Sequence, residues 1–133
     1  DALGGAPGVR SARYARDELP PDADRPVIDR ANYRRLLREL DDVPAERRSA
    51  RFVCHLALAE PGRVLLESRG LFEGRILDEP RGENGFGYDP VFFVPELERT
   101  AAELAPEEKN RISHRGEAVR RLAELLRELL DSP

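Results

Sequence analysis

The segment from Gly82 to Pro90 combines glycines, two aromatic side chains and a carboxylate. Its glycines, Gly87 among them, allow positive φ angles and let the main chain approach a ligand closely. The rings of Phe86 and Tyr88 can stack on the face of a nucleobase. Asp89, held extended before a proline, can accept hydrogen bonds from a donor edge. These properties favour a base-binding loop, but the spacing also fits a tight turn whose aromatic side chains pack into the core.

A second group of residues, suited to an anionic ligand, lies nearer the C-terminus. Lys109 is the only lysine in a chain whose other basic residues are arginines. If Ser113 caps the last helix, His114 and Arg115 lie in its first turn, where free N–H groups and the helix dipole attract anions. Lysine offers a compact charge and arginine a planar fork for phosphate. The alternative is a solvated helix start whose charges pair with the neighbouring glutamates Glu107, Glu108 and Glu117.

The N-terminal part of the chain predicts a long loop followed by one helix. Residues 1–26 are rich in Gly, Pro and Ala without periodicity, so we expect a loop there. After Asp29, a candidate N-cap, apolar residues follow at helical spacing, namely Tyr33, Leu36, Leu37 and Leu40. Pro44 is expected to end this helix.

The middle of the chain predicts a sheet. Alternating apolar residues over 52–58 indicate a strand, and the turn at 60–63 leads into a second extended run over 64–69. These two runs predict a hairpin, which a third stretch over 71–77 continues. A short buried strand at 91–94 follows the glycine-rich loop. Bends or bulges are expected at the two glycines of this region, Gly70 and Gly74.

The C-terminal part predicts two helices. Thr100 with Glu103 fits a capping box, and Pro106 suits the first turn of a short helix. The last helix is expected to begin after Ser113, with its apolar residues lining one face: Val119, Leu122, Ala123, Leu126 and Leu130. The order of elements fits a mixed α/β or α+β domain that comprises residues 1–133.

Composition and charge narrow the class of protein. With 133 residues, 40% of them hydrophobic and 36% charged, the chain fits one soluble globular domain. No apolar run approaches the roughly 18 residues of a membrane span. The net charge is −4 and the basic residues are spread along the chain, which argues against a nucleic-acid partner. The lone cysteine, Cys54, and the lack of a signal-like N-terminus favour a cytoplasmic location, and both Cys54 and His55 are expected to be structural.

Several of these segments together resemble one known family. In order, the chain contains Asp-Ala-Leu-Gly-Gly-Ala-Pro-Gly at 1–8, Ser-Ala-Arg-Tyr-Ala at 11–15, Gly-Phe-Gly-Tyr-Asp-Pro at 85–90, Thr-Ala-Ala-Glu-Leu at 100–104, Lys109, and Ser-His-Arg at 113–115. These motifs are similar to those of the inosine triphosphate/xanthosine triphosphate pyrophosphatases, the Ham1-like family. The similarity extends from the first residue to about Leu126.

The resemblance implies a fold, an activity and a set of contacts. The fold is α/β of the Ham1/Maf-like type, elongated and two-lobed, with a long mixed central sheet. The implied enzyme is a homodimeric, Mg²⁺-using hydrolase that converts noncanonical purine triphosphates (ITP, dITP and XTP) to the monophosphate and pyrophosphate. The family's base-binding segment falls here on Phe86, Gly87, Tyr88 and Asp89. Its other substrate contacts fall on Lys109, His114 and Arg115.

Two motifs of that family have no counterpart in this sequence. One is a Thr/Ser-x-Asn-x-x-Lys loop that holds the phosphates, and the other is an Asp-Asp-Ser-Gly segment that supplies the catalytic, Mg²⁺-binding aspartate. We therefore expect an N-terminally truncated member that lacks the first strand and helix and has no catalytic or metal-binding residue of its own. The expected activity belongs to the full-length protein, with little or none in this chain alone. The alternative is a catalytically incomplete domain that binds nucleotides or a partner.

Overall fold

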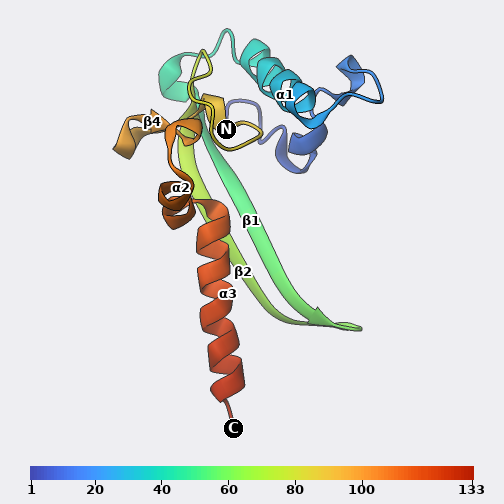
Figure 1. Ribbon diagram of the computed structural model, residues 1–133, viewed down its shortest axis with the longest axis vertical. Coiled ribbons are helices and arrows are strands. Elements are labelled where there is room, and N and C mark those ends of the chain that lie inside the picture. Colours follow the sequence, from blue (N-terminus) through green and yellow to red (C-terminus); the bar gives the residue numbers. More distant parts are fainter. The chain divides into compact units, whose positions relative to one another are not determined.

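The computed structural model describes all residues, 1–133, and the chain divides into two compact units. Unit 1 comprises residues 1–50 and 74–105, and unit 2 comprises residues 51–73 and 106–133. Helices and a four-stranded sheet make up the chain, which confirms the α/β class (Figure 1). None of the helices has the length and apolar character needed to cross a bilayer.

The helix of unit 1, α1, spans Arg25–Glu39. Its N-cap is Asp24, whose side chain accepts a hydrogen bond from the Val27 N–H at 3.3 Å. The prediction of Asp29 as the cap was wrong, because Asp29 lies one turn inside the helix. The expected loop before α1 is largely turns, with two short 3₁₀ helices, η1 at Gly8–Arg13 and η2 at Arg16–Glu18.

The sheet has the strand order β1-β2-β3-β4. Its strands are β1 at Ser49–Glu60, β2 at Arg63–Ile76, β3 at Phe92–Val94 and β4 at Arg99–Thr100. The register pairs Arg75 with Phe93 and Phe93 with Thr100, and both of these strand pairs are antiparallel. The predicted strands at 64–69 and 71–77 are one continuous strand, so the expected bend at Gly70 does not interrupt it.

Unit 1 contains most of the fully buried side chains. Phe92, Val91 and Leu104 are almost completely shielded from solvent, and Leu36 of α1 is also buried. Short 3₁₀ helices lie between the longer elements here: η3 at Ala45–Arg47, η4 at Asp89–Val91, η5 at Pro95–Leu97 and η6 at Ala101–Glu103. The predicted capping box is present at the start of η6. Irregular segments of unit 1 are therefore packed around a genuine core.

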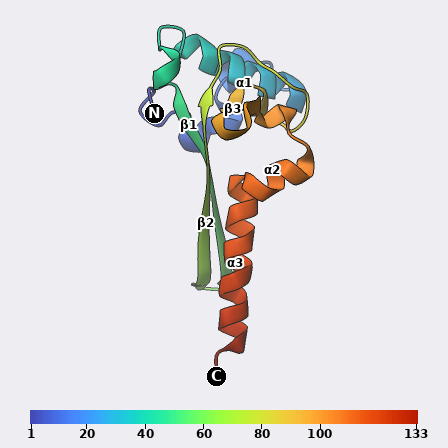
Figure 2. The same ribbon diagram turned by 90° about the vertical axis from the view of Figure 1, so that its left-hand side faces the viewer.

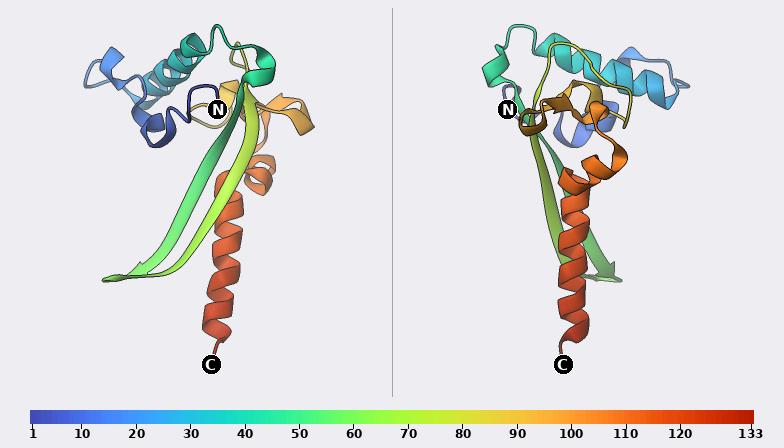
Figure 3. Two further views of the ribbon diagram at one scale, coloured as in Figure 1. Left: turned by 180° about the vertical axis from the view of Figure 1, so that it is seen from behind. Right: turned by 60° about the vertical axis from the view of Figure 1, so that its left-hand side comes forward.

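Unit 2 consists of the long parts of β1 and β2 with two helices, α2 at Pro106–Ile112 and α3 at His114–Asp131. Ser113 is the N-cap of α3, as predicted, and its side chain accepts the Gly116 N–H at 3.1 Å. Figures 2 and 3 show α3 running beside the hairpin of β1 and β2. The Ser68 hydroxyl on β2 donates to the Ala118 carbonyl at 2.7 Å, which fixes the start of α3 against the strand.

The inward face of α3 agrees in part with the predicted one, because Leu122, Ala123 and Leu126 of the predicted stripe are half-buried. Only Ala118 is buried on this helix, and Leu122 and Leu125 are half-buried at the next two turns along the same face. Val119 and Leu130, two members of the predicted stripe, are 56% and 74% exposed.

β2 and α3 approach each other closely at Gly70. A Cβ at this position would lie 1.9 Å from the His114 carbonyl oxygen and 2.7 Å from the Ala118 nitrogen, both main-chain atoms. Because main-chain atoms cannot move aside cheaply, only glycine fits this contact. The glycine expected to bend the strand instead places the first turn of α3.

Candidate functional site

The turn that follows Gly85 lies in unit 1 and is closed by its own carboxylate. Oδ2 of Asp89 accepts the Phe86 N–H at 3.1 Å, and the Asp89 N–H donates to the Phe86 carbonyl at 3.2 Å. Gly85 and Gly87 have φ angles of +74° and +62°, which L side chains rarely adopt. A Cβ on Gly85 would also meet the Asp89 carboxylate at 2.0 Å. The glycines are thus required by the shape of the turn.

The two aromatic side chains of this turn have different environments. Tyr88 is only 9% exposed, and its hydroxyl donates to the Ser11 carbonyl at 2.7 Å. Phe86 is 50% exposed. Core packing, the alternative interpretation of both rings, therefore describes Tyr88 and not Phe86. The ring that remains accessible to a ligand is that of Phe86.

Burial also determines the chemistry of Tyr88. Loss of solvent raises the pKa of its hydroxyl well above the usual value, the nearby Asp29 carboxylate raises it further, and Arg35 partly opposes both effects. The phenol therefore stays protonated and donates a hydrogen bond. Asp89 is buried as well, with 3% of its surface exposed. Its carboxylate is directed into the turn rather than toward solvent.

A carboxylate from α1 supports the turn from outside. Oδ2 of Asp29 accepts the Gly87 N–H at 3.0 Å, across 58 residues of sequence. Oδ1 of the same side chain lies 2.9 Å from Nε of Arg25 in an ion pair. The sequence predicted a capping role for Asp29 and gave no indication of this contact. No local signal identifies it, because the partner is a main-chain group of a distant loop.

Asn32, also on α1, holds the Ser-Ala-Arg-Tyr segment. Its Oδ1 accepts the Ala15 N–H at 2.8 Å, and its Nδ2 donates to the Ala12 carbonyl at 3.2 Å. The side chain is 2% exposed. The sequence analysis missed this residue, although its spacing from Leu36 and Leu40 places it on the apolar face of the helix. A polar residue at such a position indicates a buried polar contact.

The segment that forms η6 supports the start of the glycine-rich loop. The Asn84 N–H donates to the Ala102 carbonyl at 3.0 Å, and the Thr100 hydroxyl donates to the Arg81 carbonyl at 2.6 Å. Glu103 accepts the Thr100 N–H at 2.9 Å and pairs with Arg81 at 2.8 Å. These contacts, the Thr100 N–H first, lower the pKa of Glu103 below its usual value. The Thr-Ala-Ala-Glu-Leu motif therefore acts as a support for the loop.

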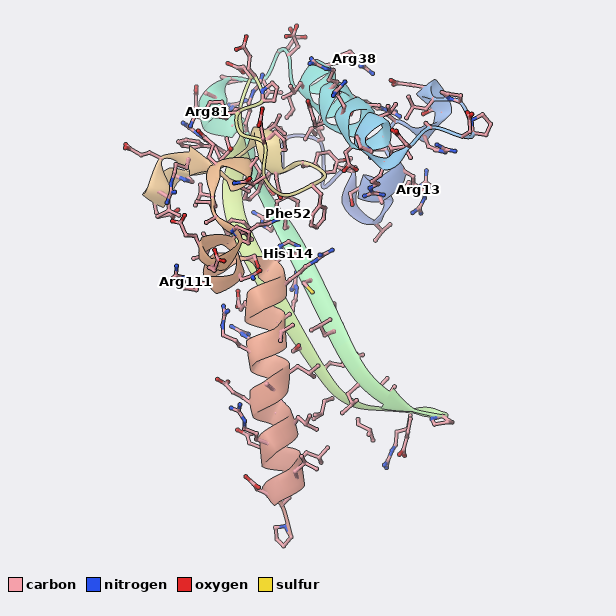
Figure 4. All side chains as sticks on the ribbon, viewed as in Figure 1. Arg13, Arg38, Phe52, Arg81, Arg111 and His114 are labelled. Carbon is pink, nitrogen blue, oxygen red and sulfur yellow. The ribbon has the colours of Figure 1, made fainter.

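The second predicted group lies in unit 2, at the corner between α2 and α3. The imidazole of His114 stacks on Phe52 of β1, with ring centroids 5.0 Å apart and planes inclined by 17° (Figure 4). Phe72 of β2 lies 6.5 Å from the same imidazole. Two strands therefore fix the orientation of a histidine in the first turn of α3.

Main-chain atoms of α2 and α3 lie close together at this corner. The Ser113 N–H donates to the Lys109 carbonyl at 2.8 Å, and a Cβ on Gly116 would lie 1.8 Å from the Asn110 carbonyl. Lys109 is half-buried, whereas Arg115 is exposed. The structure thus brings Lys109, His114 and Arg115 together in unit 2 and Phe86–Asp89 together in unit 1.

The structure offers no ready metal site within the chain. No group of three or more His, Cys, Asp or Glu side chains is arranged to hold a metal ion. A bound Mg²⁺ needs carboxylate oxygens, usually together with substrate phosphates and waters. The residues of this chain therefore do not by themselves fit a resident Mg²⁺.

Comparison with known proteins gives consistent matches. The model of the Ham1 family matches residues 1–125. A dITP/XTP pyrophosphatase of Geobacillus kaustophilus is 53% identical over 130 residues, 98% of this chain and 60% of that protein. A HAM1 protein structure from Coxiella burnetii is 46% identical with a TM-score of 0.81, and the match covers 96% of this chain and 61% of that one. The Ham1 protein structure from Staphylococcus aureus is 40% identical with a TM-score of 0.82, and the match again covers 96% and 61%. The chain spans about 60% of the length of the curated relatives it matches.

Proposed function

The chain belongs to the Ham1 family, and from that premise we propose that the protein hydrolyses noncanonical purine nucleoside triphosphates, namely ITP, dITP and XTP. Water attacks the α-phosphorus, the bond from the α-phosphorus to the bridging oxygen breaks, and the monophosphate and pyrophosphate are released. The observation that carries this proposal is 53% identity, over 98% of the chain, with a dITP/XTP pyrophosphatase. The protein would thereby remove deaminated purines from the nucleotide pool.

The turn of unit 1 is proposed to bind the purine. Phe86 supplies the exposed ring, which can stack on the base at roughly 1–3 kcal/mol. Gly87, Tyr88 and Asp89 frame the turn and set the position of that ring through the hydrogen bonds they make. A ring on a constrained turn loses less conformational freedom on binding than a ring on a mobile one.

The corner of unit 2 is proposed to bind the substrate through positive charge. Lys109 is half-buried and supplies a compact positive charge suited to an anion. His114 and Arg115 lie in the first turn of α3, where the dipole of an 18-residue helix favours negative groups. Stacking on Phe52 holds the His114 ring in one orientation.

Other properties of the whole protein are part of the proposal. We propose that residues 1–133 form the C-terminal portion of the pyrophosphatase domain and that the catalytic carboxylate is supplied from outside them. Mg²⁺ is proposed as the metal, entering with the triphosphate oxygens, which are its usual ligands in such sites. We further propose a homodimer in the cytoplasm, without a nucleic-acid or membrane partner. The single cysteine agrees with a reducing compartment.

The experiment is pyrophosphate release from dITP, XTP and dATP in the presence of Mg²⁺. It compares this chain with a longer form that spans the full length of the relatives, called the extended form below. We expect the extended form to act on dITP and XTP much faster than on dATP, and this chain to be nearly inactive. Equal rates on all three nucleotides would contradict the proposed purine preference.

The role of Lys109 is tested by Lys109→Ala in the extended form. Loss of a charge-assisted contact is expected to weaken dITP binding by roughly tenfold or more while the unfolding midpoint changes little. The matched control is Arg127→Ala, which removes an exposed cation farther along α3. A large loss of stability with unchanged dITP binding would instead assign Lys109 a structural role.

A further inference from the structure

Asp29 makes a contact that its place in α1 does not require. The cap of α1 is Asp24, and Asp29 lies one turn later with 14% of its side chain exposed. A carboxylate in that position ordinarily faces solvent. Here Oδ2 accepts the Gly87 N–H at 3.0 Å, and Oδ1 pairs with Arg25 at 2.9 Å. The side chain therefore joins the helix to the turn that carries Phe86.

The turn presents two consecutive main-chain donors, and carboxylates of the protein accept both. The Phe86 N–H is accepted by Asp89 at 3.1 Å, and the Gly87 N–H is accepted by Asp29. Successive N–H groups in a turn of this kind form a concave anion site when they are available. In this molecule the two aspartates occupy that site. A phosphate is therefore disfavoured at the turn, which leaves the exposed Phe86 ring as its binding feature.

Asp29 links the turn to another element of unit 1, the helix α1. Gly87 has a φ angle of +62°, and a Cβ built on it meets no atom within 4 Å. The Cβ side of this residue is therefore open, and the hydrogen bond from its N–H to Asp29 restricts its main chain. The Tyr88 hydroxyl makes a second link, to the Ser11 carbonyl. Without the Asp29 carboxylate, the main chain at Gly87, between the residue that carries the exposed ring and Tyr88, would lose this restraint.

We propose that Asp29 is a positioning residue of the nucleotide site: its carboxylate holds the Gly87 N–H and so fixes the conformation in which the Phe86 ring meets the purine. This inference rests on the proposed function. It assigns Asp29 no contact with the substrate. Its effect is on the geometry of binding, so it appears in KM more than in kcat.

The test measures kcat and KM for dITP in the extended form carrying Asp29→Ala or Asp29→Asn. Asp29→Ala is expected to raise KM by roughly tenfold, because a hydrogen bond to a charged group is lost, with kcat changed by less than about threefold. Asp29→Asn retains an oxygen acceptor, so its KM is expected to lie close to that of the unsubstituted extended form. The matched control is Asp24→Ala, which removes the acceptor of the Val27 N–H within α1 and is expected to lower stability without raising KM.

Different results overturn different claims. Absence of dITP turnover in the unsubstituted extended form would overturn the proposed function and this inference with it. Turnover with an unchanged KM in Asp29→Ala would overturn only the inference, as would an Asn variant as impaired as the Ala variant. Amide hydrogen exchange in this chain provides a second test that does not depend on enzymatic activity. Exchange at Gly87 is expected to accelerate in Asp29→Ala and not in Asp24→Ala, and equal exchange in the two variants would also overturn the inference.

Discussion

The two compact units of this chain are stabilised in different ways. Unit 1 contains all of the largest fully buried side chains, namely Phe92, Leu104, Val91, Asn32 and Thr100. Unit 2 is built from two long strands and a long helix, yet that helix buries only Ala118. Short irregular segments need a core and polar side-chain contacts to hold one conformation, whereas regular elements satisfy their own main-chain groups. We infer that the stability of unit 1 depends on particular buried side chains, whereas that of unit 2 depends on the close approach of main-chain segments.

The largest expected effect is that of Phe92→Ala in unit 1. The ring is 2% exposed, and its removal leaves a cavity in the core, so the free energy of unfolding should fall by about 3–5 kcal/mol. Urea unfolding measures this change. The matched variant in unit 2 is Phe52→Ala. Because Phe52 is only half-buried, its removal should lower the free energy of unfolding by less than that of Phe92. An equal loss of unfolding free energy in the two variants would contradict the proposed difference between the units.

Gly70→Ala tests the claim about unit 2. The new methyl group would overlap the His114 carbonyl oxygen, so β2 and α3 must separate, and we expect a loss of about 1–3 kcal/mol on urea unfolding. Arg69→Ala, at the adjacent exposed position, serves as the control and should stay within about 0.5 kcal/mol of the parent. A neutral Gly70→Ala would mean that the close approach does not determine the position of α3.

Tyr88→Phe is expected to have a smaller effect that depends on pH. At neutral pH it removes one hydrogen bond, at a cost of about 0.5–1.5 kcal/mol. Because the pKa of Tyr88 is raised in the folded state, the unfolded chain releases this proton first, near pH 10. The native protein should therefore lose stability as the pH rises above about 10, and Tyr88→Phe should lack that part of the loss.

Urea unfolding between pH 7 and 10.5 measures this difference. Tyr33→Phe, which alters a half-buried tyrosine of α1, is the control and should keep the alkaline loss of the parent. If the parent and Tyr88→Phe lose stability with the same slope above pH 10, the buried phenol does not contribute as described.

Local patterns predicted most of the regular elements and two of their caps. The capping box at Thr100 and the cap at Ser113 are both present, because each depends on residues within one turn of the cap. The hairpin also followed from short-range spacing, whereas the order of elements fitted both α/β and α+β, and the resemblance to a family favoured α/β. The cap of α1 was predicted wrongly: it is Asp24, which is followed by a proline in the first turn, and not Asp29. The contact that gives Asp29 another role comes from Gly87, which is distant in sequence.

Long-range packing accounts for the other differences. The glycine at 70 looks like a break in a strand until α3 is placed against it. The burial of Tyr88 and the exposure of Phe86 cannot be read from their spacing, because the Ser11 carbonyl that accepts the Tyr88 hydroxyl is 77 residues away. Motifs that resemble a family therefore indicated the candidate site residues, and the structure assigned each of them an environment.

The most direct test of base binding by this turn is the kcat/KM for dITP of the extended form carrying Phe86→Ala. Phe86→Tyr, which retains an aromatic ring, is measured as the control. The proposal that the exposed Phe86 ring stacks on the purine predicts a fall of roughly 10- to 100-fold for Phe86→Ala, mainly through KM, and near-parent values for Phe86→Tyr. Parent-like kcat/KM in Phe86→Ala, with dITP still preferred over dATP, would contradict the claim that this turn binds the base.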